Sequence, residues 1–183
     1  MKSKKFLSIL LSLVLLGLVF SVSACAEQKN ESTAKKPVMA VKCTSRASNG
    51  RLLTACAYQS AGGQNQVPAV SWTPVEGANA YAIYMLDTSA NNWCHWIAKV
   101  GPAQTKIKQG EKLKSSRYKG PYPPSGQHRY KIIVYALKKA PASLPGNFDK
   151  KNSASAIENK LGRSNIITSA STIVPYAHGD QNV

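Results

Sequence analysis

Acidic residues are scarce in this chain. Its 183 residues contain 8 Asp and Glu against 24 Lys and Arg, which gives a formal net charge of +16 at pH 7. Such an excess favours contact with polyanions of a cell envelope, such as anionic lipid headgroups or wall polymers. The basic residues are spread along the chain without interleaved aromatic side chains or a DNA-binding motif, so we expect no nucleic-acid partner. A solvated basic surface that only aids solubility is the simpler alternative.

Long apolar runs are also rare, and the clearest one lies at the start of the chain. It extends from Phe6 to Phe20 behind three lysines, which are Lys2, Lys4 and Lys5. The run is short for a membrane span and is typical of a secretory signal, so residues 1–24 are predicted to be a signal peptide. Without those lysines, 21 basic residues stand against 8 acidic ones, a balance of +13.

The signal ends in Val22, Ser23, Ala24 and Cys25, which look like a bacterial lipobox. Cleavage before Cys25 and acylation of its thiol, for example with palmitate, would anchor the protein firmly by two or more chains. We therefore expect a lipoprotein on the exported side of a bacterial cell membrane, with residues 25–40 as a flexible tether. An ordinary signal peptide with an incidental cysteine, or an uncleaved membrane helix, are the alternatives.

The chain has only four cysteines. With Cys25 lipidated, Cys43, Cys56 and Cys94 allow at most one intramolecular disulfide. Cys43 with Cys56 is the first candidate, because the strong turn pair Asn49-Gly50 could bring them together. Cys56 with Cys94 stays open as the rival pairing.

The sequence has no internal repeat and is consistent with one domain over residues 41–176, followed by a polar tail at 177–183. Its composition, 43% hydrophobic and 17% charged, is that of an ordinary globular protein. Most segments are predicted to be strands, with residues 101–119 left as a loop. Strands are expected at 41–45, 52–58, around Trp72, and at 78–86, 93–100, 127–137 and 166–176, and a helix at 153–161 capped by Ser153 or Ser155.

The most informative segment is residues 118–137, YKGPYPPSGQHRYKIIVYAL. Its prolines and glycines predict a shaped loop, and the residues after Gly126 read as a strand. Alternation along that strand places His128, Tyr130 and Ile132 on one face and Arg129 on the other. An imidazole and a phenol are thus expected side by side at the mouth of the loop.

A second strand carries another histidine in the sequence DTSANNWCHW, residues 87–96. Strand parity predicts that Trp93, His95 and Ile97 share one face, and that Cys94 and Trp96 share the other. Neighbouring side chains on opposite faces cannot form a Cys94–His95 nucleophile and base. No thiol enzyme is therefore expected here.

Together these two segments closely resemble the phosphatidylethanolamine-binding protein family, including its bacterial members related to Raf kinase inhibitor proteins. The family pattern Y-x-GP-x-PP-x-G-x-HRY is almost intact, and the family's HW pair is present. Its DPDxP box is reduced here to DTSANN, which keeps Asp87 and loses a rigid turn and a second carboxylate. The resemblance covers residues 41–176 and implies a mainly β fold, an antiparallel β-sandwich with a few short helices. The matching positions are Tyr118, Gly120, Pro121, Pro123, Pro124, Gly126, His128, Arg129 and Tyr130.

The candidate site implied by the resemblance combines two imidazoles, a phenol, a carboxylate and loop walls. Such groups, with backbone amides, can bind a phosphate or a carboxylate. Asp87 would orient a histidine or receive an ammonium group, which favours a zwitterionic ligand or a structural role. No cofactor and no metal are expected. The site residues are Asp87, His95, Gly120, Pro121, His128 and Tyr130.

Three functions follow as hypotheses. The first is a membrane-anchored, non-enzymatic protein that binds a small anionic ligand or a phospholipid headgroup. The second is a protein-interaction module that inhibits a protease or kinase through the basic loop from Lys106 to Lys119, with a protein partner. The third, a metal-dependent hydrolase using Asp87, His95 and His128, requires a transition metal on those three side chains.

Overall fold

The computed structural model describes residues 38–181 of the chain. The predicted signal peptide at 1–24, the lipidation site Cys25 and most of the tether at 25–40 lie outside these residues. No helix within residues 38–181 combines the length and hydrophobicity of a membrane-spanning segment.

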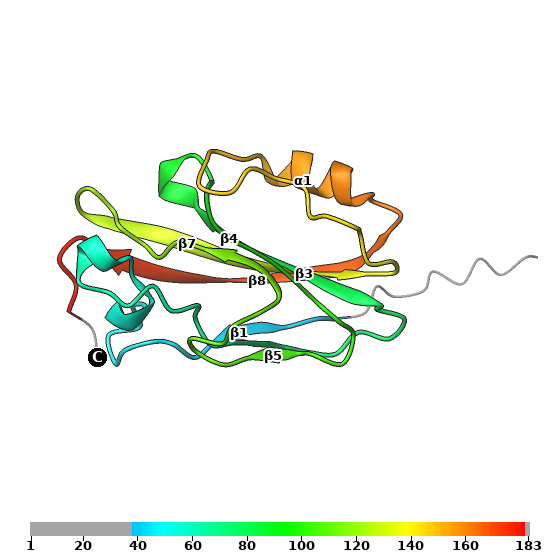
Figure 1. Ribbon diagram of the computed structural model, residues 1–183, viewed down its shortest axis with the longest axis horizontal. Coiled ribbons are helices and arrows are strands. Elements are labelled where there is room, and N and C mark those ends of the chain that lie inside the picture. The colour runs from blue at the N-terminus through cyan, green and yellow to red at the C-terminus, as the bar shows by residue number, and fades with distance from the viewer. Residues whose placement is uncertain (1–37, 182–183) are drawn as a thin grey trace, which may run out of the picture. The chain divides into compact units, whose positions relative to one another are not determined.

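A five-stranded antiparallel sheet forms the centre of the domain, with strand order β6-β4-β3-β7-β8 (Figure 1). The middle strand β3 pairs with β4 on one side and β7 on the other. These three strands carry most of the residues proposed for the site. The bounds are β3 Ala80–Asp87, β4 Trp93–Val100, β6 Ser115–Tyr118, β7 Gln127–Leu137 and β8 Ile166–Ala177.

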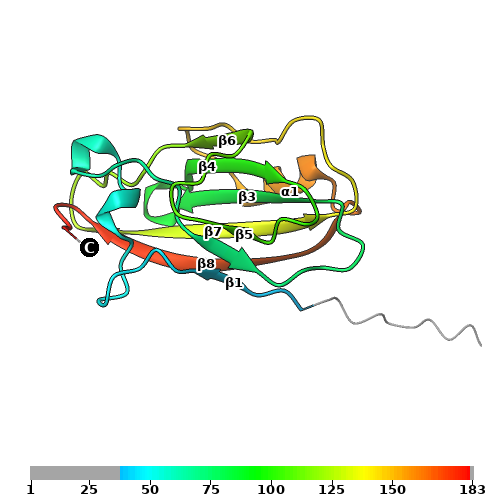
Figure 2. The ribbon, with the colours of Figure 1, turned by 60° about the horizontal axis from the view of Figure 1, so that its bottom comes forward.

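A second sheet of three short strands lies against one face of the first, as Figures 1 and 2 show. Its order is β1-β2-β5, with β1 at Val41–Cys43, β2 at Val70–Trp72 and β5 at Lys106–Ile107. Side chains from both sheets share one hydrophobic cluster, which includes Trp72, Ile107, Trp96 and Ile132. The expected mainly β fold, an antiparallel β-sandwich, is confirmed.

The other face of the five-stranded sheet is covered by α1, Ala154–Leu161, and the chain that leads to it (Figure 1). Ile157 and Leu161 of this helix pack on Tyr84, Tyr135 and other side chains of the sheet. The Ser153 hydroxyl accepts a hydrogen bond from Ala156 N at 3.3 Å, so the predicted cap is confirmed. Three 3-10 turns complete the fold, at Thr54–Cys56, Gln59–Ala61 and Thr88–Ala90.

The predicted parity of β7 is also confirmed. Tyr130, Ile132 and Val134 belong to the core between the sheets, whereas Ile133 and Tyr135 belong to the cluster beneath α1. The pleat of a strand sends successive side chains to opposite faces, and here both faces are covered. This explains why the strand is apolar almost throughout.

The parity predicted for β4 is wrong because of a β-bulge. Met85 of β3 lies opposite Trp96, and the next residue, Leu86, lies opposite Cys94, so His95 is an extra residue. Trp96 therefore joins the core between the sheets, while Cys94 and Ile97 join the cluster beneath α1. Cys94 and His95 still point to opposite faces, as expected.

Two segments between strands also differ from expectation. Residues 52–58 do not form a strand, since Leu52 makes one bridge to Arg46 and the chain then enters the 3-10 turn at Thr54–Cys56. Residues 101–119 are not one loop, because they contain β5 and the edge strand β6. Both strands are short and lack an alternating apolar pattern, so their sequence does not predict a strand.

The expected Cys43–Cys56 disulfide is absent from the structure, in which Cys43, Cys56 and Cys94 are free, buried thiols. Cys43 and Cys56 do share the core between the sheets. Burial raises the pKa of Cys56 to about 12, so this thiol stays protonated and cannot act as the attacking thiolate. Cys94 lies on the far face of the five-stranded sheet, which excludes the rival pairing with Cys56.

The ordered domain extends slightly beyond both predicted boundaries. Met39 is buried in the core between the sheets, and Ala40 O accepts a hydrogen bond from Thr73 N at 3.0 Å. At the other end, Asp180 forms an ion pair with Arg51 at 2.6 Å. The first residues of the predicted polar tail therefore belong to the fold.

Candidate ligand-binding site

The site begins with a buried hydrogen bond between side chains of β3 and β7. His128 Nδ1 lies 2.6 Å from Asp87 Oδ2, and the Asp87 carboxylate is only 3% exposed. Because a carboxylate accepts, Nδ1 carries the proton and donates it to Asp87. This contact is the histidine-orienting role expected for Asp87, and its other expected role, to receive an ammonium group, stays a prediction. No hydrogen bond within residues 38–181 engages Nε2 of His128, so this atom is available to a ligand.

The second histidine is fixed in the same way by a backbone carbonyl. His95 Nδ1 lies 2.9 Å from Lys119 O, and a carbonyl can only accept, so Nδ1 again carries the proton. Burial lowers the pKa of His95, and the backbone of Lys119 and the charge of Asp87 oppose this shift less strongly. The ring is therefore neutral at neutral pH, with its lone pair on Nε2.

Tyr130 lies between the two imidazoles. Its ring makes an edge contact with His95 at a centroid distance of 5.2 Å and stacks on His128 at 6.5 Å. Among the described residues, no group gives its buried hydroxyl a hydrogen bond of ordinary geometry. Burial, and next the charge of the neighbouring Asp87 carboxylate, raise the pKa of Tyr130. The hydroxyl is thus a protonated donor whose acceptor among the described residues is the Asp87 carboxylate, and this hydrogen bond also raises its pKa.

The altered DTSANN segment still shapes this corner, by different contacts from a proline turn. Asp87 caps the 3-10 turn at Thr88–Ala90, where its Oδ1 accepts from Ser89 N at 2.9 Å. The Thr88 hydroxyl donates to Arg129 O at 2.9 Å, and Arg129 N donates to the Ser89 hydroxyl at 3.1 Å. Hydroxyl groups of this segment therefore bind the backbone at the start of β7, and no second carboxylate is needed for this contact.

Gly120 and Pro121, the expected loop walls, follow Lys119, whose carbonyl binds His95, and they offer no free amide. Gly120 N donates to Asn65 Oδ1 at 2.7 Å, and proline has no amide hydrogen. Pro121 O accepts from Tyr58 N at 3.0 Å. These two residues therefore offer a ligand no free backbone N–H, and the expected role of backbone amides stays a prediction. Asn65, which holds Gly120 in place, was missed because its polar loop carries no motif.

Lys119 and Asp149 are further neighbours that the sequence did not reveal. Their side chains form an ion pair at 2.8 Å, and Asp149 also accepts from Trp93 Nε1 at 3.0 Å. Burial by itself would raise the pKa of Asp149, but the hydrogen bonds from Lys119 and Trp93 outweigh it and the pKa is lowered. The pair joins residues 30 apart in sequence, so no local pattern predicts it.

The site is covered in this structure. His95 is 9% exposed and Tyr130 is 1% exposed, while the His128 side chain is 17% exposed and forms the accessible part. Four surface hollows of about 220 to 330 Å³ are lined by other residues. Within residues 38–181, no group of three His, Cys, Asp or Glu side chains is arranged to hold a metal ion.

Comparison with known proteins agrees with this architecture. The sequence pattern of the phosphatidylethanolamine-binding protein family matches residues 44–171, which include every residue of the site. The chain belongs to the phosphatidylethanolamine-binding protein family. A relative in this comparison is a UPF0098 protein of Methanothermobacter thermautotrophicus, 30% identical over 125 residues that cover 57% of this chain and 82% of the relative.

Two solved structures of this family share the fold. One is a proposed phosphatidylethanolamine-binding protein homologue from Chlamydia trachomatis, with a TM-score of 0.60 and 18% identity over 76% of this chain and 97% of that one. The other is YbcL of E. coli, with a TM-score of 0.58 and 21% identity over 76% of this chain and 98% of that one. At these identities the likeness concerns the fold.

Replacing Gly120 by alanine should destabilise the domain. A Cβ at this position would overlap the backbone of Cys56 and Ala57, so the loop would have to move. We expect the free energy of unfolding to fall by about 2 kcal/mol or more in urea denaturation. Gly101→Ala is the matched control, because its Cβ would meet nothing within 4 Å. Equal stability of the two variants would contradict the close approach.

The neutral state of His95 predicts a dependence of stability on pH. Because its pKa is lower in the folded chain than in the unfolded one, the folded state binds fewer protons. The stabilisation of the folded state by this pKa difference is complete above about pH 6.5, the pKa of histidine in the unfolded chain. It is lost as the pH falls from there through the lower pKa of the folded chain. The free energy of unfolding should therefore decrease more between about pH 7.5 and about pH 5 in the wild type than in His95→Gln. Parallel decreases in urea denaturation would contradict a buried neutral imidazole.

Proposed function

We propose that this protein is a non-enzymatic binding protein for a small ligand that carries a phosphate or carboxylate group, such as a phospholipid headgroup. One observation carries the proposal. Two histidines, each fixed through Nδ1 by an acceptor, flank the buried Tyr130 hydroxyl, whose partner among the described residues is the Asp87 carboxylate. That carboxylate already accepts from Ser89 and His128, so an oxyanion can take over the Tyr130 hydroxyl as an acceptor beside the ring nitrogen Nε2 of His128.

The charges favour a ligand that is zwitterionic rather than purely anionic. Asp87 contributes a buried negative charge, and the neighbouring imidazole of His95 is neutral at neutral pH. A phosphate beside this pair is repelled by Asp87, whereas a phosphate with an ammonium group carries its own compensation. Phosphoethanolamine has this chemistry. The covered site must open for such a ligand, and the exposed edge of His128 is the place where it enters.

The Asp87–His128 pair alone does not support catalysis. No Ser, Thr or Cys side chain within residues 38–181 forms a hydrogen bond to either imidazole. Cys94 lies on the opposite face of β4, and burial raises its pKa to about 12, so it is no thiolate nucleophile. A histidine base needs such a partner within reach for nucleophilic catalysis.

Titration with phosphoethanolamine tests the binding role. His128→Gln can keep an N–H for Asp87 but loses the ring nitrogen Nε2 that faces the ligand, and we expect binding to weaken about tenfold or more. Tyr130→Phe removes the buried hydroxyl and keeps the ring, so it should change the free energy of unfolding by only about 1 kcal/mol while it also weakens binding. Calorimetric titration measures both variants.

Unchanged binding in both variants would refute this site. The remaining candidate is then the protein-interaction role, in which inhibition of a protease or kinase survives loss of His128. The basic segment from Lys106 to Lys119 expected for that role is not one loop, since it forms β5 and β6 at its two ends.

We further propose that Cys25 anchors the protein to the exported side of a bacterial cell membrane. The support is the small-residue sequence before Cys25 behind a basic and apolar segment. A Cys25→Ser chain should therefore not incorporate labelled palmitate and should lose its mature membrane-bound form in fractionated cells. Ala24→Ser, which keeps a small residue beside the thiol, is the control and should still be lipidated. An unmodified mature chain that lacks Cys25 would exclude the anchor.

A further inference from the structure

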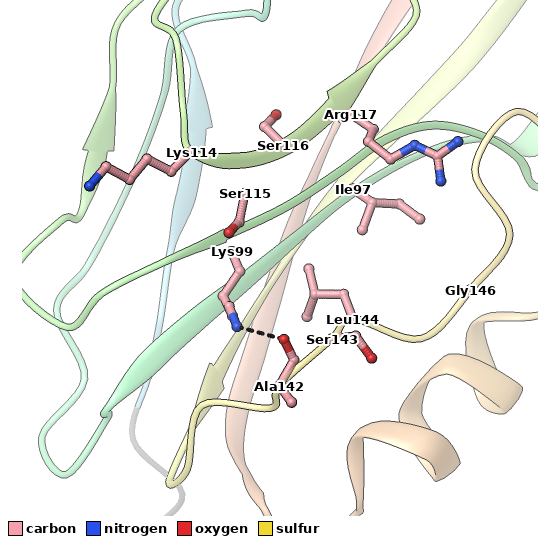
Figure 3. A pocket seen from close by; sticks show the side chains of 10 residues that line it. All are labelled: Ile97, Lys99, Lys114, Ser115, Ser116, Arg117, Ala142, Ser143, Leu144 and Gly146. Carbon is pink, nitrogen blue, oxygen red and sulfur yellow. Dashed lines mark hydrogen bonds between the residues drawn. The ribbon is translucent and has the colours of Figure 1, made fainter.

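A basic hollow lies on the face of the five-stranded sheet that is opposite the site of Tyr130. It has a volume of about 330 Å³ and is formed by β4, β6 and the chain at 142–146 (Figure 3). Its floor contains Ile97 and Leu144, which pack in the cluster beneath α1, whereas Tyr130 packs in the core between the sheets. The hollow is thus separated from the family site by the sheet itself.

Strand register explains why basic side chains lie together in this hollow. Ile97 of β4 pairs with Arg117 of β6, and Lys99 pairs with Ser115. Paired residues of an antiparallel sheet point to the same face, and residues two apart do so as well. The four side chains therefore share the face that Ile97 occupies. Ser116, between them in β6, is turned to the other face, where its hydroxyl accepts from Trp96 Nε1 at 2.9 Å.

The positive charges of this hollow are not neutralised by the protein. The lining contains no carboxylate, and Lys99, Lys114 and Arg117 take part in none of the ion pairs within residues 38–181. Lys99 Nζ donates to the carbonyls of Pro141 and Ala142, at 2.5 and 3.2 Å, which fixes its position. Arg117 lies over the Phe148 ring at 4.5 Å, which orients the guanidinium. Its N–H groups form no hydrogen bond and no ion pair with the other described residues.

The remaining groups of the hollow suit an oxyanion. Ser115 and Ser143 add hydroxyl donors to its lining. In Figure 3, Lys99 and Arg117 lie on either side of Ile97 and Leu144, while Lys114 extends away toward the rim. A guanidinium with free N–H groups matches the oxygens of phosphate, and a partly apolar floor strengthens the attraction compared with open water. The volume is at the lower end for ligand pockets, as a small headgroup requires.

We infer that this hollow is a second ligand site, which binds a phosphate group through Arg117, with Lys99 adding positive charge on the other side of the apolar floor. The bound group is either a free phosphate ester or the phosphate of an anionic lipid, since both present the same oxygens. The site does not depend on the ligand proposed for Asp87, His95, His128 and Tyr130, because the two groups of residues lie on opposite faces of one sheet.

Backbone amide shifts measured by NMR for the full chain in a maltoside detergent test this inference. Inorganic phosphate, added at constant ionic strength against chloride, should shift the amides of Lys99 and Ser115 to Arg117 in a saturable way. Arg117→Gln should weaken this binding about tenfold or more, because it removes a charged donor. Arg117→Lys keeps the charge without the planar guanidinium, so its affinity for phosphate should lie between those of the wild type and Arg117→Gln.

Lys106→Gln is the matched control, because Lys106 is an exposed lysine of β5 in the other sheet and its loss changes the net charge equally. Equal effects of Lys106→Gln and Arg117→Gln would overturn the inference in favour of a general charge effect. Absence of saturable shifts at Ser115 to Arg117 would overturn it as well. His128→Gln should leave these shifts unchanged, so failure of the family site and failure of this one are distinguishable.

Two further measurements identify the source of the phosphate. One is titration with glycerol 3-phosphate, and the other is co-sedimentation with phosphatidylcholine vesicles with and without phosphatidylglycerol. If Arg117→Gln reduces the extra binding to the anionic vesicles more than Lys106→Gln does, the ligand is a lipid phosphate. If Arg117→Gln weakens only the binding of glycerol 3-phosphate, the ligand is a free phosphate ester. Either result supports the site.

Discussion

The buried carboxylate of Asp87 is the constraint on which the rest of the site depends. A charge with 3% exposure requires partners for both oxygens, and they are Ser89 N and His128 Nδ1. The first contact forms the 3-10 turn after β3, and the second fixes the tautomer of His128. Side chains of this 3-10 turn also form hydrogen bonds with the backbone of Arg129. One carboxylate thus organises the end of β3, the start of β7 and the ligand-facing imidazole.

The position of β3 between β4 and β7 brings the two histidines together. His95 comes from β4 and His128 from β7, and each strand pairs with β3. The bulge at His95 breaks the alternation of β4, so the imidazole and Trp96 both face the side of Tyr130. Without the extra residue, one of the two side chains would point beneath α1. A local irregularity therefore makes room for the second imidazole of the site.

The few carboxylates of the described chain are mostly committed to structural contacts. Asp87, Asp149, Glu158 and Asp180 are each within 4.0 Å of a basic side chain. The excess of lysine and arginine consequently remains largely unpaired, and on the face of β4 and β6 it meets a hollow. The two faces of the central sheet thus differ in electrostatic character. One holds the buried carboxylate of Asp87 with two imidazoles, and the other holds lysine and arginine side chains that form no ion pair among the described residues.

The sequence by itself determined the elements whose signals are local. Alternation gave the faces of β7, Ser153 marked the start of α1, and the loop motif before His128 identified the family and most site residues. Only the tertiary structure decided the bulge at His95, the partner of Asp87 and the contact of Gly120 with the backbone at residues 56–58. The tertiary structure also decided that the cysteines are free thiols and form no disulfide. Each depends on groups far apart in the chain, whose distances are set by sheet register and packing rather than by neighbouring residues.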